Sequence, residues 1–229
     1  MEDKNFIKIS YTGRIKGGNI FDTTDEEVAM KEGIHDKNKV YGLLPVVVGE
    51  GQIIKGLDEA LKGMELKEEK EIEIPPEKAY GKRNPDLIKL VSLRAFKQKG
   101  ITPVAGMTLE LDGRPARIQT VSGGRVRVDF NHKLAGKTLL FNVKVEERAE
   151  TDQERVRFLI ERNFNSSEDV GVKIKKDKGV EITLPRKAYT DKNIVLRKAS
   201  LSAEIFKYLK SDDVTYKEIW ENPEKKKEK

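Results

Sequence analysis

The chain has 229 residues, and its 45 basic residues are interleaved with 39 acidic ones to a net charge of +6, which argues against nucleic acid as a partner. No apolar run is long enough to span a bilayer, and the opening MEDKNF lacks the apolar segment of a secretory signal, so we expect a cytoplasmic protein with no membrane partner. The absence of cysteine excludes disulfides, thiolate nucleophiles and Cys-ligated zinc, and the two histidines, His35 and His132, are too far apart in sequence to suggest a metal site.

Residues 1–82 and 132–149 carry the pattern of one discontinuous α+β domain. Thr24 and Glu27 have capping-box spacing ahead of a short helix, and a second short helix is predicted over 56–64, where the apolar residues share one face. Alternating or continuous apolar residues predict strands over 5–11, 43–49, 69–75 and 137–147. We expect an antiparallel sheet wrapped over a short helix.

A different pattern interrupts this domain at residues 83–131. NPDLIKLVSLRAF predicts a helix over 84–96. Three strands follow, over 107–111, 116–121 and 125–130, and the turn signals DGRP and SGG separate them. We interpret this segment as an inserted small β domain, which a host tolerates when the two ends of the insert lie close together.

Residues 150–229 form a third predicted unit, a C-terminal α+β domain. Thr151 and Glu154 make a capping box ahead of a helix, VGVKI and GVEITLP predict a hairpin, and 200–210 predicts a second helix. The mixed-charge ending NPEKKKEK predicts a disordered tail. So short a unit supplies a small core, and we therefore expect it to self-associate and make the protein a homodimer.

Four stretches, in this order, carry a family resemblance: YTGRIKGGNIFDTT, VVVGEGQIIKGLDEALKGM, EIPPEKAYG and LLFNVKVEE. They resemble the FKBP-type peptidyl-prolyl cis-trans isomerases. The interruption after AYG, followed by NHKLAGKTLLFNVKV, resembles the SlyD-type branch, which carries a domain inserted in its flap. With the C-terminal unit, the whole chain is similar to a long-chain archaeal member of that group.

The resemblance implies a pocket for the proline ring of an Xaa-Pro substrate. Ile54 would offer its backbone N–H and Tyr80 its hydroxyl to the substrate, while Asp22 would either polarise the site or orient Tyr11 and the adjoining loop. The implied site consists of Tyr11, Phe21, Asp22, Ile53, Ile54, Leu57, Tyr80 and Phe141. No cofactor and no metal are implied, and the His-rich metal-binding tail of some bacterial relatives is absent.

Rotation about an Xaa-Pro bond is a reaction that apolar and aromatic residues can catalyse. Rotation about an Xaa-Pro bond must pass a resonance barrier of about 18–20 kcal/mol, and an apolar aromatic pocket disfavours the charge-separated planar amide. A site that binds the twisted amide more tightly lowers this barrier without base, nucleophile or metal. The sequence therefore predicts a peptidyl-prolyl isomerase and folding chaperone for unfolded or nascent polypeptides.

Other interpretations stay open at this point. Each aromatic could be ordinary sheet core. Leu57 stands where many relatives have a large aromatic, which favours a non-catalytic holdase that binds unfolded chains through the pocket and the insert. The basic surface could instead serve a ribosome- or RNA-associated factor, which a salt-dependent binding assay would decide.

The insert has more apolar residues in its predicted helix than a unit of its size needs. They either pack inside the insert or leave apolar surface exposed for unfolded chains. The resemblance implies a chaperone role for the insert and favours the second interpretation. The predicted client-binding residues are Leu87, Ile88, Leu90, Val91 and Phe96.

Overall fold

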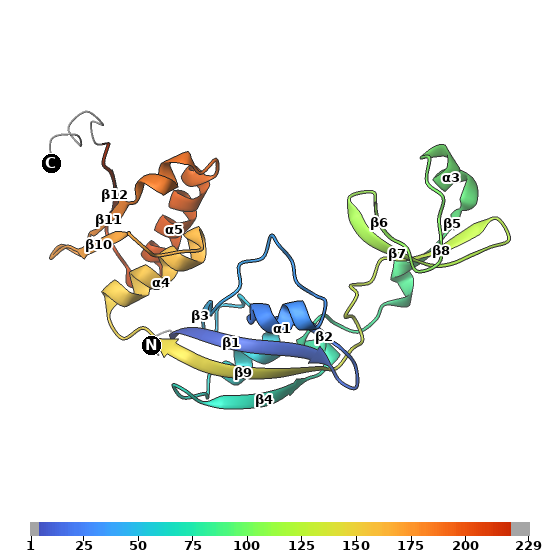
Figure 1. Cartoon of the computed structure of the whole chain (residues 1–229), viewed down its shortest axis with the longest axis horizontal. Helices are drawn as coiled ribbons and strands as arrows, with labels where there is room; N and C mark the ends of the chain where they lie inside the picture. The colour runs from blue at the N-terminus through green and yellow to red at the C-terminus, as the bar shows by residue number, and fades with distance from the viewer. Residues whose placement is uncertain (1–4, 221–229) are drawn as a thin grey trace.

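The computed structural model describes residues 5–220, whose strands form three sheets (Figure 1). The central sheet is antiparallel throughout and has the order β2-β1-β9-β4, with β3 pairing the start of β1. Its strands are β1 (Phe6–Ile15), β2 (Ile20–Thr23), β3 (Leu44–Val47), β4 (Glu69–Ile74) and β9 (Leu139–Arg148). The helices α1 (Glu26–Lys31) and α2 (Lys55–Leu61) and the short 3-10 turn η1 (Pro76–Lys78) complete this unit.

The core of this unit lies between the sheet and α2. Leu57 and Leu61 of α2 are buried against the face of β9 that carries Phe141 and Val143. Gly56 allows the helix to come this close, because a Cβ there would lie 2.4 Å from Cγ2 of Ile74. The predicted antiparallel sheet wrapped over a short helix is confirmed.

The start of α1 differs from the prediction. The residue that caps the helix is Asp25, whose side chain accepts from the N–H of Val28 at 3.0 Å. Thr24, directly after β2, instead hydrogen-bonds to β1, since its hydroxyl accepts from the N–H of Tyr11 at 2.9 Å. The prediction of a capping box at Thr24 is wrong because Asp25 is an equally good cap one residue later and β1 takes the threonine.

The insert forms the second sheet, in the order β5-β8-β7-β6. The predicted helix over 84–96 is wrong for most of its length, because a strand runs through its middle and pairs with β8, with Val91 opposite Val126. Tertiary pairing of β-branched residues outweighs helical spacing here. The elements are η2 (Pro85–Leu87), β5 (Ile88–Ser92), α3 (Leu93–Gln98), β6 (Thr108–Leu111), β7 (Arg114–Ser122) and β8 (Arg125–Asp129).

The two chain segments that join the insert to the central unit are hydrogen-bonded to each other. The Asn131 side chain accepts from the Asn84 N–H at 2.8 Å and donates to the Asn84 carbonyl at 2.9 Å. Further back, the N–H of Gly136 donates to the carbonyl of Gly81 at 2.8 Å. The ends of the insert therefore lie side by side on the central unit.

The C-terminal unit packs two helices on the third sheet. The Thr151–Glu154 capping box and the antiparallel hairpin are confirmed. The final strand, which pairs in parallel with β11, is not anticipated by the sequence pattern, and the predicted tail lies outside the described residues. The elements are α4 (Asp152–Phe164), β10 (Gly171–Ile174), β11 (Val180–Leu184), η3 (Arg186–Thr190), α5 (Ile194–Leu209) and β12 (Val214–Glu218).

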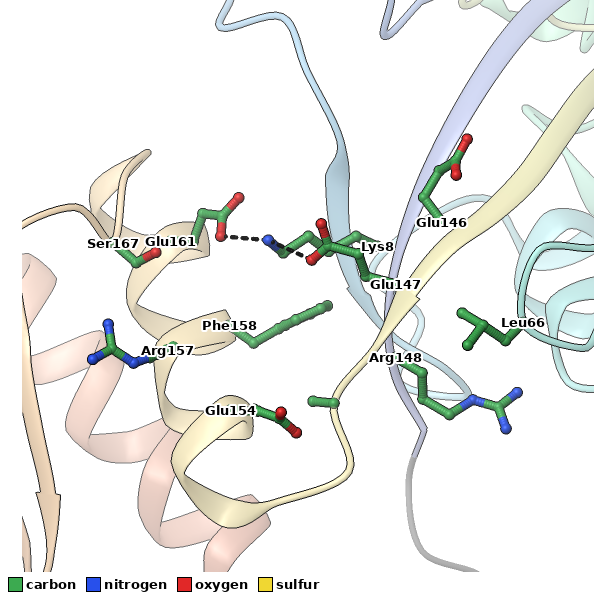
Figure 2. A pocket seen from close by; sticks show the side chains of 11 residues that line it. Lys8, Leu66, Glu146, Glu147, Arg148, Glu154, Arg157, Phe158, Glu161 and Ser167 are labelled. Carbon is green, nitrogen blue, oxygen red and sulfur yellow. Dashed lines mark ion pairs between the residues drawn. The ribbon is translucent and has the colours of Figure 1, made fainter.

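The C-terminal unit shares part of its core with the central unit. Phe6 of β1 is 2% exposed and meets Phe158 and Tyr208 edge-on, at ring distances of 5.8 and 5.6 Å. Beside this contact, Lys8 lies between Glu161 of α4 and Glu147 of β9, at 2.9 Å from each (Figure 2). Figure 1 shows the insert and the C-terminal unit at opposite ends of the central sheet, both rising on the same side of it.

Candidate active site

A hollow of about 390 Å³ opens between α2, the loop before it and the strands β1 and β9. Seven of the eight residues predicted for the site line it, and the eighth, Phe21, packs behind it against Phe141. The lining residues are Tyr11, Asp22, Leu44, Gly51, Gln52, Ile53, Ile54, Leu57, Tyr80 and Phe141. The structure thus brings together residues that are up to 130 positions apart in the sequence, from Tyr11 to Phe141.

An aromatic cluster forms one wall of this hollow. The ring of Phe141 meets Tyr11 at 5.8 Å and Phe21 at 5.7 Å between centroids, the latter edge-on. Gly13 makes room for the cluster, because a Cβ there would lie 2.8 Å from the Phe141 ring and 2.9 Å from the Phe21 ring. Edge-on and tilted contacts of this kind fix ring orientations, so the wall is preorganised before any ligand binds.

Asp22 holds the Tyr11 hydroxyl in place. The hydroxyl donates to Oδ2 of Asp22 at 2.7 Å, and the Lys39 ammonium donates to the other carboxylate oxygen and to the Thr23 carbonyl. Burial, together with the hydrogen bond to Asp22, raises the pKa of Tyr11 far above its ordinary value of 10.0, so the phenol stays protonated. These contacts favour the orienting role of Asp22 over a polarising one.

Tyr80 has a different environment from Tyr11. Its ring stacks on the His132 ring at 4.1 Å and 11°, and within residues 5–220 its hydroxyl makes no hydrogen bond. Burial, with a smaller contribution from the charge of Asp22, raises the pKa of Tyr80 above 10.0. A protonated, uncommitted hydroxyl at the rim of an apolar hollow is free to donate to a ligand.

The segment that enters α2 supplies the opposite wall. Ile54 is the residue before the helix, and in the described part of the chain its N–H donates to no protein acceptor. Leu57 is 3% exposed and forms the floor. Asp58, buried behind the floor, accepts from the N–H groups of Gly49 and Gly51 at 2.7 and 3.3 Å and so fixes the loop that carries Ile53 and Ile54.

Sequence reasoning missed the residues that support this site. Lys39 lies in a charged loop with no motif, and Asp58 looks like an ordinary helix-surface acid, so neither carries a local signal. His132 belongs to the NHKLAG stretch, in which no pattern indicates its stack on Tyr80. Within residues 5–220 no group of three or more His, Cys, Asp or Glu side chains is placed to hold a metal ion.

Comparison with known proteins shows the family to which this chain belongs. The chain is 39% identical over 143 residues to a short-type peptidyl-prolyl cis-trans isomerase of Methanocaldococcus jannaschii, covering 62% of this chain and 90% of that protein. It is 35% identical over 170 residues to the FKBP-type isomerase SlyD of Treponema pallidum, covering 72% of this chain and 88% of that protein. The chain belongs to the FKBP-type peptidyl-prolyl cis-trans isomerases. A 16 kDa FKBP-type isomerase of Escherichia coli is 33% identical over 104 residues, 44% of this chain and 70% of that protein.

Two family models extend the FKBP assignment beyond the central unit. Residues 89–134 match the model described as FKBP26, IF domain, and residues 152–221 match the model described as FKBP26 C-terminal. The first contains most of the insert and the second most of the C-terminal unit. The resemblance to an FKBP-type, SlyD-like isomerase with an inserted domain is confirmed.

The predicted client-binding residues of this FKBP-type chain do not share one environment. Phe96 is 2% exposed and lies in the core of the insert, where it and Val91 line a small hollow of about 70 Å³, so its contact with a client stays a prediction. Leu90 is 65% exposed, whereas Val91 packs against the same core. Leu87 and Ile88 are half-buried.

Proposed function

We propose that the protein catalyses cis-trans isomerisation of Xaa-Pro bonds in unfolded or nascent polypeptides, with the cytoplasm as its compartment. The observation that carries this is the hollow in which Tyr11 and Phe141 form an aromatic wall, while the Ile54 N–H and the Tyr80 hydroxyl make no hydrogen bond within residues 5–220. An aromatic wall and an apolar floor beside a few polar groups suit a proline ring and its flanking carbonyls.

The arrangement supports catalysis by differential binding. The rings of Tyr11 and Phe141 and the side chain of Leu57 enclose the prolyl ring, and enclosure removes water from the amide that precedes it. The planar amide is more charge-separated than the twisted one, so loss of water raises its free energy more. Hydrogen bonds to the flanking carbonyls hold the chain while the amide rotates, and each ~1.4 kcal/mol of preference for the twisted form raises the rate about tenfold.

Exchange measurements on an Xaa-Pro tetrapeptide, with and without the protein, test this function. We expect acceleration, and Phe141→Leu should reduce it about tenfold or more because the prolyl ring loses its aromatic wall. Phe130→Leu, a matched change in the insert core, should leave the rate unchanged. If the protein binds an unfolded chain but does not accelerate exchange, the non-catalytic holdase is the correct function.

A chaperone function of the insert is part of the same proposal. The insert leaves Leu90 and Val104 exposed at 65% and 60%, which is apolar surface that an unfolded chain could contact. Because its ends are hydrogen-bonded together, replacing residues 84–130 by a short Gly-Ser bridge should leave the central unit folded. Activity on the tetrapeptide should survive this deletion better than activity on an unfolded protein, and equal losses would contradict a client-binding insert.

We also propose that the protein is a homodimer through its C-terminal unit. The helices bury Val156, Leu159, Ile160 and Ile205 inside the chain, with help from Phe6 and Val47, so core size no longer requires a partner. Exposed apolar residues remain on α5, namely Val195, Leu196 and Phe206. Light scattering of the full chain beside residues 1–148 tests the proposal, and a monomer in both cases would reject it.

A further inference from the structure

A second groove, of about 340 Å³, continues from the proline hollow. The two share Tyr11, Leu44, Gln52 and Ile53 in their linings, so a chain that leaves the hollow over these residues enters the groove directly. The groove then passes the loop at 39–45 and reaches the end of α4, where Glu161, Arg162 and Asn165 line it. One wall of the groove therefore belongs to the C-terminal unit.

The position of this wall is fixed by contacts already described. Lys8 forms an ion pair with Glu161 that joins α4 to the central sheet (Figure 2). Phe158, one turn earlier on α4, packs edge-on against Phe6. Val47 of β3 is buried in the core of the C-terminal unit. Since α4 is held to the central unit at Phe158 and Glu161, directly before Arg162, the wall of the groove has a fixed position in the folded chain.

Arg162 brings hydrogen-bond donors to the groove that the protein does not use fully. Its Nε lies 3.6 Å from Oε1 of Glu204, and its Nη1 is buried without a hydrogen-bond partner among the described residues. A buried guanidinium N–H without an acceptor is costly, whereas a bound carbonyl oxygen would satisfy it after a small side-chain movement. The side chain is 30% exposed, so such movement is open to it.

The opposite wall suits an extended main chain. Val40 is 63% exposed, and Leu43, Leu44 and Pro45 continue the apolar lining. Among the described strands β3 pairs only with β1, but on its other edge Pro45 has no N–H and the Val47 N–H donates to Oε1 of Gln52 at 2.9 Å, so this edge offers few main-chain donors. The apolar strip is therefore the part of this wall that an extended peptide would contact.

We propose that this groove binds the substrate residues flanking the proline, in extended form, and that Arg162 donates to a main-chain carbonyl of that segment. The inference rests on the proposed isomerase function and makes the C-terminal unit part of the substrate site. The substrate class is an unfolded polypeptide that continues for several residues beyond the proline. Recognition through the main chain asks for no particular side chain in the groove.

Peptide length provides the test. An Xaa-Pro tetrapeptide is compared with peptides lengthened by about six uncharged residues on one side or the other, since six extended residues reach roughly 20 Å. In the full chain we expect lengthening on one side to raise kcat/KM about fivefold or more, as one hydrogen bond plus apolar contact would give. Arg162→Gln should remove most of this gain and leave the tetrapeptide unchanged, whereas Arg186→Gln, the matched arginine change on the exposed surface of the same unit, should keep both.

Val40→Ser provides a second variant on an exposed loop, in case Arg162→Gln unfolds the C-terminal unit, and it should also reduce the gain. No gain from lengthening on either side, or a gain unchanged in folded Arg162→Gln, would overturn the inference. Binding of the longer peptide, measured by fluorescence anisotropy, distinguishes a failure of the groove inference from a failure of the proposed isomerase function. If wild type does not accelerate the tetrapeptide, weaker binding of the long peptide by Arg162→Gln still supports the groove, and equal binding rejects it.

Discussion

The hydroxyl of Tyr80 offers the sharpest test of the site, because removing it should change catalysis without changing the fold. The side chain is 38% exposed, and within the described chain the hydroxyl makes no hydrogen bond. Tyr80→Phe keeps the stack on His132, so the melting temperature should be unaffected. If the hydroxyl donates to a substrate carbonyl, its loss costs about 0.5–1.5 kcal/mol, or roughly two- to tenfold in kcat/KM.

Tyr80→Leu should cost more than Tyr80→Phe, because it also removes the stacked ring at 4.1 Å from His132. Leucine supplies neither the hydroxyl nor an aromatic ring at the rim of the site, so the total loss in kcat/KM should reach about tenfold or more. The assay is exchange between cis and trans forms of an Xaa-Pro tetrapeptide at equilibrium, which needs no coupled protease. A folded Tyr80→Phe variant with wild-type kcat/KM would remove the hydroxyl from the mechanism.

Three further predictions follow from the contacts of the site and of the shared core. Asp22→Asn should reduce kcat/KM less than Tyr80→Leu, because an amide oxygen can still accept from Tyr11, and a larger loss would indicate that the carboxylate charge acts directly. Burial, and next the charge of Lys133, lowers the pKa of His132 below 6.5, so the neutral ring stabilises the fold fully above pH 6.5 and this contribution is lost as pH falls through the lowered value. Activity should fall over the same range, and His132→Phe, which keeps a stacking ring, should flatten the profile. Phe6→Ala should lower the free energy of unfolding of the full chain by about 3–5 kcal/mol in denaturant titrations, and a loss below 1 kcal/mol would show that the shared core is not cooperative.

The sequence predicts an element correctly where the spacing of its apolar residues agrees with the strand pairing in the fold. The alternation of Leu139, Phe141, Val143 and Val145 is that of a half-buried strand, and β9 is one. The sequence pattern misleads over 84–96. The apolar residues there have helical spacing, but β5 pairs with β8, and no pattern within the segment reveals that partner. β12 lies in a short segment of mixed polarity and exists because β11 has an open edge, so nothing within the segment predicts it.

At the site, the sequence motifs predict the residues that face the hollow but not the residues that hold them in position. Asp58 and Lys39 act through main-chain N–H groups and through Asp22, contacts that require the folded loops. The sequence does not predict the groove beyond the hollow, for the same reason. It lies between Val40 and Arg162, which belong to separate units and are brought together by the packing of α4 on Phe6 and by the Lys8–Glu161 ion pair.

The shared core also has a consequence for how the protein is made. Phe6 is synthesised well before its ring partners Phe158 and Tyr208, which lie 152 and 202 positions later in the chain. At about 5–20 residues per second, the interval between Phe6 and Tyr208 is roughly 10–40 s. For the first part of this time the beginning of β1 also lacks β9, its long antiparallel neighbour, which ends at Arg148. Synthesis therefore leaves this strand edge open until β9 is made, and leaves the Phe6 ring without Tyr208 until α5 is complete.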